Sequence, residues 1–457
     1  MPDAAVYRHG TALALKESTG VRHLPSAGRK RSFIMRKIAL ISEHASPLAL
    51  AGSVDSGGQN VYVAQVARQL ARAGVQVDVF TRKDHPLLEP EQPWGDGIKI
   101  IHVPAGPQRY LPKEELLPYM DEFSACLHRH FARQRQGYDV IHANFFMSAL
   151  AALPVSQRYG VPLIVTFHAL GKVRRRYQQE ADKFPDCRFG IEDTIVRHAD
   201  CVIAECPQDR RDLMELYGAD ARRIEIVPCG YDATEMKPQL QATARAALGW
   251  DDHTFTLLQL GRMVPRKGVD NVIRALGRLH NSYGVEAKLI VVGGNAEDAS
   301  ETATPEIGRL CRIAEQEGIA SWVQFTGSRR RNELATYYSA SDVFVTTPWY
   351  EPFGITPVEA MACGRPVIGS DTGGIRTTVV HKRTGFLVPP KDPDSLAERL
   401  AELAADHELC ERMGEAGRMR ARRLYTWQRV GQDLLSVYER IGGSHTSQAR
   451  HVARIAA

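Results

Sequence analysis

Short apolar runs alternate with longer amphipathic segments along most of this chain. The runs Lys37–Ser42, Val75–Thr81 and Leu163–Phe167 have the length of strands and few polar residues, which is typical of strands covered on both faces. After the first run, Gly58 introduces a segment with helical spacing that stops at Gly74, a residue often found just past a helix end. The alternation predicts βαβ units around a parallel sheet.

The same alternation occurs a second time after a polar connecting segment that ends near Gly249. Further strands are predicted at Asp139–His142, Cys201–Ala204, Ile224–Val227, Thr254–Leu260, Ala287–Val292, Trp322–Thr326, Val343–Thr347, Pro366–Ser370 and Gly385–Val388. Helices are predicted at Val269–His280, Glu306–Glu315, Asn332–Ala340, Pro357–Ala362 and Ser395–Ala405, with a helix pair within Met413–Ile441. Two doubly wound α/β domains would leave a cleft at the carboxyl ends of their strands, where such sheets bind ligands.

Four segments are expected from these patterns. Residues 35–232 and 250–425 form the two Rossmann-like domains, and residues 426–441 form a final helix for which packing back on the first domain is one option. Residues 1–34 are polar and basic, so they are interpreted either as a disordered extension or as the result of a start codon placed too far upstream.

Composition narrows the class of protein. The 457 residues are 44% hydrophobic and 24% charged, as in ordinary soluble enzymes, and the net charge of +5 argues against a dedicated nucleic-acid binder. The eight cysteines show no zinc-like spacing, which favours free thiols in a reducing compartment. No run approaches the ~18 apolar residues of a membrane span. We therefore expect a cytoplasmic protein with no metal site.

The segment from Glu351 to Glu359 carries the strongest chemical signal. Glu351 lies in a loop after a predicted strand, and Glu359 lies in the helix that follows. The turn between them places backbone N–H groups near a helix N-terminus, where they can hold a phosphate or sugar oxygen; these residues are Phe353, Gly354, Ile355 and Thr356. Glu359 can accept both hydroxyls of a ribose, and Glu351 can accept hydroxyls of a transferred sugar. Taken alone, each glutamate would be interpreted as a solvated charge.

This segment, EPFGITPVEAMACGRPVI, resembles the hallmark of the retaining glycosyltransferases of the GT-B fold, in particular glycosyltransferase family 4. The stretch Gly261–Gly268 resembles the diphosphate-binding segment of that family, and Arg262 and Lys267 match its two cations. Two cations beside a diphosphate suit the charge that departs in glycosyl transfer. The resemblance covers about Met35 to Ile441 and implies two Rossmann-like domains that face a central cleft.

Two further sites come from the first half of the chain. Gly57 and Gly58 allow a backbone to approach a phosphate or sugar closely, and their surroundings resemble the first loop of the sucrose-phosphate synthase and mycothiol glycosyltransferase branch, beginning at Asp55. The G-x-G-x-x-G fingerprint is absent there, which argues against a nicotinamide dehydrogenase. His168 lies just past a strand, and the resemblance implies a position near the 6-hydroxyl of the donor sugar and a part in transfer.

A basic run follows His168. Lys172, Arg174 and Arg175 either form a solvated face or bind an acceptor phosphate, as comparable residues do in the branch just named. Asn144 is placed with them in the acceptor-binding set.

The resemblance implies transfer of a hexosyl group, with retention, from a nucleoside-diphosphate sugar to a sugar, polyol or sugar-phosphate acceptor. The expected donor is similar to UDP-glucose, and no cofactor or metal is expected. The expected catalytic residues are His168, Arg262, Lys267 and Glu351. The alternatives are a GT-B nucleotide-sugar epimerase, a phosphorylase, for which no pyridoxal lysine segment is found, and a non-catalytic nucleotide-sugar-binding protein.

Overall fold

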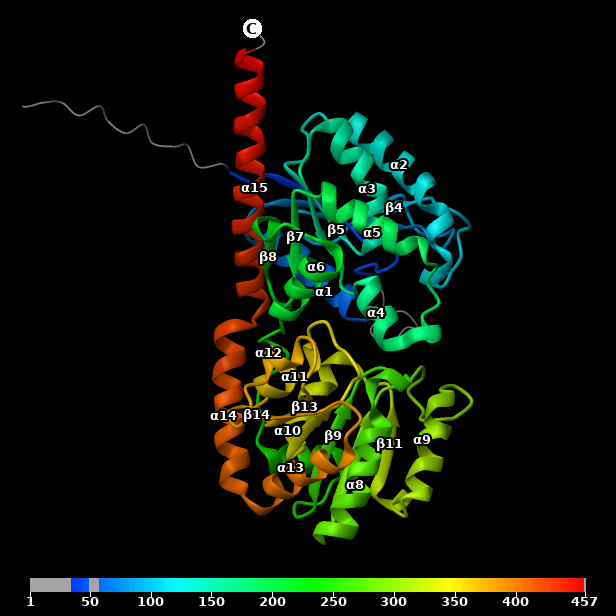
Figure 1. The fold of residues 1–457 in the computed structure, drawn as a ribbon, viewed down its shortest axis with the longest axis vertical. Helices are drawn as coiled ribbons and strands as arrows, with labels where there is room; N and C mark the ends of the chain where they lie inside the picture. The colour runs from blue at the N-terminus through cyan, green and yellow to red at the C-terminus, as the bar shows by residue number, and fades with distance from the viewer. Residues whose placement is uncertain (1–33, 49–56, 456–457) are drawn as a thin grey trace, which may run out of the picture. The chain divides into compact units, whose positions relative to one another are not determined.

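Two β-sheets, each flanked by helices, organise the chain (Figure 1). The computed structural model describes residues 34–48 and 57–455, with side chains as far as His445. The expected extension 1–34, apart from Ile34, lies outside these ranges, as does Asp55 of the first glycine loop.

The first sheet has the order β3-β4-β2-β1-β5-β6-β7-β8, in which β3 pairs antiparallel with β4 and the other pairs are parallel. Its strands are β1 (Lys37–Ile41), β2 (Gln76–Arg82), β3 (Glu91–Pro93), β4 (Ile98–Val103), β5 (Val140–Asn144), β6 (Leu163–Thr166), β7 (Cys201–Ala204) and β8 (Ile224–Ile226). β3 and β4 are additions to the predicted set.

The second sheet is parallel and has the order β11-β10-β9-β12-β13-β14. Its strands are β9 (Phe255–Leu260), β10 (Ala287–Val292), β11 (Val323–Gly327), β12 (Val343–Thr346), β13 (Val367–Ser370) and β14 (Gly385–Val388). Most residues of these strands are buried, because helices cover both faces of each sheet. The predicted α/β class is confirmed.

The helices connect the strands in the manner of βαβ units. They are α1 (Gly58–Arg72), α2 (Met120–Arg133), α3 (Phe146–Tyr159), α4 (Gly171–Gln178), α5 (Cys187–His198), α6 (Pro207–Tyr217), α7 (Gln241–Leu248), α8 (Val269–Tyr283), α9 (Pro305–Gln316), α10 (Leu334–Ala340), α11 (Ile355–Ala362), α12 (Ile375–Thr378), α13 (Pro393–Ala405), α14 (His407–Leu424) and α15 (Trp427–Ile455). None of the described helices combines the length and the apolar composition that a membrane span requires.

The last helix, α15, lies against the first sheet and its helix α1, so the final part of the chain returns to the half formed by its beginning (Figure 1). Its Tyr438 hydroxyl hydrogen-bonds Nδ1 of His142 on β5 at 2.6 Å, and Arg440 pairs with Glu225 on β8 at 2.6 Å. The helix continues to Ile455, well beyond the Ile441 that the sequence pattern indicated.

The two passages of the chain between the sheets run side by side. Tyr231 belongs to the first passage and Thr426 to the second, and these two residues form an isolated parallel bridge. The N–H of Tyr231 donates to the carbonyl of Tyr425 at 2.8 Å, and the N–H of Trp427 donates to the carbonyl of Tyr231 at 3.1 Å. Gly230 is required here, because a Cβ atom on it would lie 2.9 Å from Trp427.

Candidate active site

A cavity of about 480 Å³ lies at the carboxyl ends of strands from both sheets. Its walls include segments that follow β1, β6 and β7 of the first sheet and β9 and β12 of the second. The predicted site residues among its lining are Gly57, Gly58, His168, Arg174, Arg262, Lys267, Glu351, Phe353, Gly354, Ile355, Thr356 and Glu359. Asn144, Lys172 and Arg175 do not line it.

A cationic cluster forms one part of the cavity wall. Arg262, Arg266 and Lys267 come from the loop after β9, and the ammonium of Lys267 donates to Oε2 of Glu351, which follows β12. Gly268 makes this approach possible: its φ is +67°, and a Cβ atom there would lie 2.0 Å from the carbonyl oxygen of Thr347.

The charges of this cluster are unbalanced. Burial raises the pKa of Glu351, but Lys267, Arg266 and Arg262 lower it by more, so its pKa lies below the usual value. Burial also lowers the pKa of Lys267, and the two arginines add to this effect, although Glu351 opposes it. Three cations thus surround one carboxylate, and the excess positive charge suits an anion such as a diphosphate.

Glu359 lies one turn into α11 and its side chain is only 2% exposed. Its Oε1 accepts from Nη2 of Arg331 at 2.9 Å, and its Oε2 accepts from the hydroxyl of Tyr338 at 3.1 Å. Because each carboxylate oxygen can accept about two hydrogen bonds, each retains one acceptor position. Two adjacent hydroxyls of a ribose fit this remaining capacity. Gly354, with φ of +90°, precedes α11 and begins its first turn.

His168 is fixed from three sides. Its Nδ1 lies 2.9 Å from Oε1 of Glu205, its Nε2 lies 3.0 Å from Oδ1 of Asn144, and its ring packs edge-on against Tyr62 with centroids 4.8 Å apart. Its φ of +57° is unusual for a residue other than glycine, and such strain persists only where neighbours hold it. Asn144 therefore touches the candidate site through His168.

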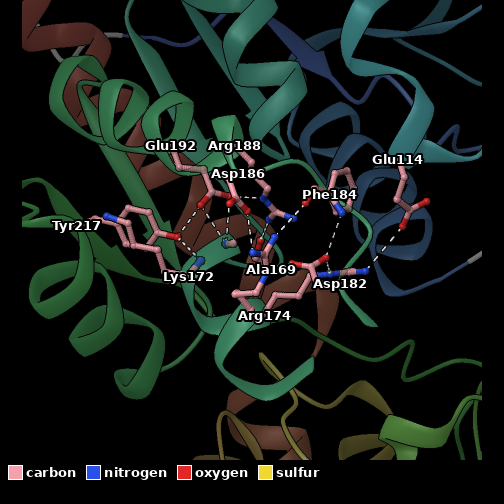
Figure 2. Close-up of polar contacts among 12 residues, drawn as sticks. Glu114, Ala169, Lys172, Arg174, Asp182, Phe184, Asp186, Arg188, Glu192 and Tyr217 are labelled. Carbon is pink, nitrogen blue, oxygen red and sulfur yellow. Dashed lines mark hydrogen bonds and ion pairs between the residues drawn. The ribbon is translucent and has the colours of Figure 1, made fainter. Parts of the chain in front are cut away.

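The basic run lies on α4, and only part of it lines the cavity; Figure 2 shows Lys172 and Arg174 among their polar partners. Each member has an acidic partner: the pairs are Lys172–Asp193 (2.6 Å), Arg174–Asp182 (2.6 Å) and Arg175–Asp186 (2.7 Å). Arg174 also faces the cavity, whereas Lys172 additionally donates to the carbonyl of Leu216 at 2.8 Å. Of the three predicted acceptor cations, only Arg174 is positioned at the cavity in this structure.

A buried ion pair supports the segment that follows His168 (Figure 2). Nε of Arg188 donates to Oε1 of Glu192 at 2.7 Å, and Nη2 of Arg188 donates to the carbonyl of Ala169. Glu192 also accepts from the N–H of Gly171 at 2.9 Å and from the hydroxyl of Tyr217 at 2.5 Å. Burial raises the pKa of Glu192, although Arg188 and these hydrogen bonds oppose the rise. The guanidinium carbon lies 4.6 to 5.1 Å from the ring centres of Phe145, Phe146 and Phe184.

The residues at the site that the sequence pattern missed include Arg266, Arg331, Glu205 and His44. Glu205 and His44 both follow strands closely, so their positions at strand ends were a usable signal. His44 lines the cavity, and its Nδ1 lies 2.7 Å from the buried carboxylate of Glu43. Arg331 stands last in a run of three arginines, and nothing local indicates which of the three reaches Glu359.

Two α/β sheets with a cavity of cations and carboxylates at their strand ends form the kind of site in which such folds bind an anionic ligand. The family model "Glycosyl transferases group 1" matches residues 241–420, and "Glycosyltransferase Family 4" matches residues 56–235. The chain belongs to this family of glycosyltransferases with the GT-B fold.

Curated relatives and a solved structure agree with this assignment. The chain is 36% identical over 408 residues to the D-inositol 3-phosphate glycosyltransferase of Acidothermus cellulolyticus, an alignment that covers 88% of this chain and 90% of the relative. The corresponding protein of Kineococcus radiotolerans is 34% identical over 426 residues, with coverage of 90% and 97%. The sucrose-phosphate synthase of Thermosynechococcus elongatus is 32% identical, with a TM-score of 0.81 and coverage of 90% of this chain and 100% of that chain.

The predictions of family, GT-B fold and glycosyl transfer are thereby confirmed. These relatives give no support to the epimerase or to the non-catalytic alternative.

Proposed function

We propose that this glycosyltransferase moves a hexosyl group from a nucleoside-diphosphate sugar such as UDP-glucose to the hydroxyl of a phosphorylated sugar or polyol, with retention at the anomeric carbon. The main support for this function is the set of charged groups at the end of the cavity where the donor would bind. There, three cations surround Glu351, and Glu359 keeps two acceptor positions open. The first feature fits a diphosphate and the second fits a ribose.

The acceptor end has its own support. Arg174 and Lys113 line the same cavity, and an acceptor phosphate there would compete for these two cations with their present partners, the carboxylates of Asp182 and Glu114. The relatives named for D-inositol 3-phosphate and for sucrose-phosphate synthesis act on, or form, phosphorylated sugars or polyols, as their names state. Lys172 and Arg175 would bind the acceptor phosphate only after they release their acidic partners, Asp193 and Asp186.

The charged residues of the cavity suggest how transfer proceeds. Arg262 and Lys267 stabilise the negative charge that develops on the diphosphate when the bond from the anomeric carbon to the phosphate oxygen breaks. An acceptor hydroxyl forms the new bond on the same face, and its proton passes to the departing diphosphate oxygen. Glu351 is held by Lys267 and accepts hydroxyls of the donor sugar, whereas His168 contacts that sugar from the other sheet. The cations supply the compensating charge, so we propose that no divalent metal is required.

The cytoplasmic location inferred from the cysteine pattern is part of the same proposal.

The test is transfer by the purified protein. UDP-, ADP- and GDP-hexoses are incubated with inositol phosphates, sugar phosphates and their unphosphorylated forms, in the presence of EDTA. We expect nucleoside-diphosphate release only when an acceptor is present, and proton coupling constants of the product that match the anomer of the donor. A neutral sugar as the best acceptor would contradict the phosphate site, an inverted product would contradict retention, and loss of turnover in EDTA would contradict the metal-free mechanism.

A further inference from the structure

Arg331 links the two carboxylates Glu359 and Glu235 at the edge of the cavity. Its Nη2 donates to Oε1 of Glu359 at 2.9 Å, and its Nε donates to Oε2 of Glu235 at 2.6 Å. The side chain of Glu359 is 2% exposed and that of Arg331 is 23% exposed, so solvent screens the inner pair weakly. Burial lowers the pKa of Arg331, but the two carboxylates raise it above its usual value. The guanidinium therefore remains charged while it holds Glu359.

Arg331 differs sharply from its two neighbours in sequence. Arg330 is exposed at 77% and lies 3.8 Å from Glu297, while Arg329 donates to the hydroxyl of Tyr337 at 3.0 Å. Of these three consecutive arginines, only Arg331 reaches the carboxylate that faces the nucleotide end of the cavity.

The anchor of Arg331 comes from the segment that joins the two sheets. Glu235 follows a turn in which Asp232 accepts from the N–H of Thr234 at 2.8 Å and from its hydroxyl at 2.6 Å. The other oxygen of Asp232 lies 3.3 Å from the amide nitrogen of Gln65, on helix α1. The joining segment thus fixes the position of Glu235. Through Glu235 it also orients the guanidinium of Arg331, which the loop of Arg331 alone would not do.

We propose that Arg331, held by Glu235, is a positioning residue that orients Glu359 toward the ribose hydroxyls and thereby sets the discrimination between ribonucleotide and 2′-deoxyribonucleotide donors. This inference rests on the proposed function, in which Glu359 binds the ribose. The terminal torsion of a glutamate is broad, so a carboxylate held only by Tyr338 can rotate away from the two hydroxyls. A buried carboxylate without its cation also tends to take up a proton, and it then loses acceptor capacity.

The experiment compares the binding of UDP, ADP and GDP with that of their 2′-deoxy forms by isothermal titration calorimetry. A hydrogen bond to a charged group is worth roughly a factor of 10 to 150 in binding, so the wild-type protein is expected to prefer its ribonucleotide at least about tenfold. Arg331→Gln should reduce this preference to about threefold or less. Glu235→Gln, whose partner pair is more exposed, should reduce it partly, and it tests the inference should Arg331→Gln fail to fold. Arg330→Gln is the matched control and should leave the preference unchanged.

Each outcome bears on a different claim. If Arg331→Gln and Glu235→Gln bind both nucleotide forms more weakly but keep the wild-type preference, Arg331 does not position Glu359 and the inference is overturned. If the wild-type protein binds a ribonucleotide and its 2′-deoxy form equally, Glu359 does not bind the 2′-hydroxyl and the inference falls, while glycosyl transfer itself stands. If the wild-type protein binds none of the three diphosphates, the proposed function fails as well.

Discussion

Replacing Arg188 with methionine would remove a buried cation and leave the carboxylate of Glu192 inside the first half of the protein. Breaking a buried ion pair in this way costs about 3–5 kcal/mol. Glu192 would keep two donors, the N–H of Gly171 at 2.9 Å and the hydroxyl of Tyr217 at 2.5 Å, so we expect a cost near the lower limit, about 3 kcal/mol. Arg188→Met should also slow transfer, because the carbonyl of Ala169 beside His168 loses its donor.

The cost should depend on pH with a defined sign. Burial already raises the pKa of Glu192, and loss of Arg188 raises it further. A carboxyl whose folded pKa is raised destabilises the fold fully above that pKa, and the penalty disappears as the pH falls to the unfolded value near 4.5. The destabilisation by Arg188→Met should therefore shrink between neutral pH and that value.

Native-state hydrogen exchange of the amides in β6 and α4 measures this effect locally. A loss of about 3 kcal/mol corresponds to exchange faster by roughly 100- to 200-fold. Lys172→Met is the matched control, because its pair with Asp193 is partly exposed and such pairs contribute about 1 kcal/mol or less. The double variant with Glu192→Gln should recover most of the loss. Equal exchange in Arg188→Met and Lys172→Met would refute the reasoning.

Three further predictions concern the donor side. Glu359→Ala should weaken binding of the nucleoside diphosphate about 10- to 100-fold in calorimetry, because two hydroxyls lose a charged acceptor; unchanged affinity would contradict the ribose contact. Gly268→Ala should lower the urea midpoint more than Gly284→Ala does. An alanine at either position adopts a positive φ, which costs about 1–2 kcal/mol, but only at position 268 does the new Cβ atom also collide with Thr347. Equal losses would contradict this. Diphosphate affinity should fall as the pH rises through the lowered pKa of Lys267, because the ammonium loses its proton; a Lys267→Arg variant should show no such fall in the same titration.

The strand pattern of the sequence was sufficient for most of the fold. β7, β10 and β14 have the bounds that their apolar runs indicated, because nearly all their residues are buried and apolar, with Lys288 of β10 as the polar exception. Helix α3 gave no such signal: it contains Pro154 and is apolar on most sides, so neither a helical period nor a clean boundary is visible. In β4, the exposed Lys99 interrupts the apolar run.

The candidate site was predictable where a motif is contiguous and unpredictable where a contact is distant. Glu351 and Glu359 belong to one segment and both line the cavity. The contact of His168 with Glu205 joins different strand ends, and no local pattern specifies it. No local pattern specifies the contact of Lys172 either. Its ammonium pairs with Asp193 on α5, and this pairing draws the charge away from the cavity.

The return of α15 to the first sheet makes the first half of this enzyme discontinuous in sequence. The buried hydrogen bond between His142 and Tyr438, for example, forms only once the ribosome has added Tyr438, which follows the entire second sheet in the chain. A nascent chain therefore exposes the uncovered face of α1 while the second half is being made. The first half is expected to reach its final stability only after α15 has been made, and a fragment that ends before Trp427 would carry that apolar face permanently into water.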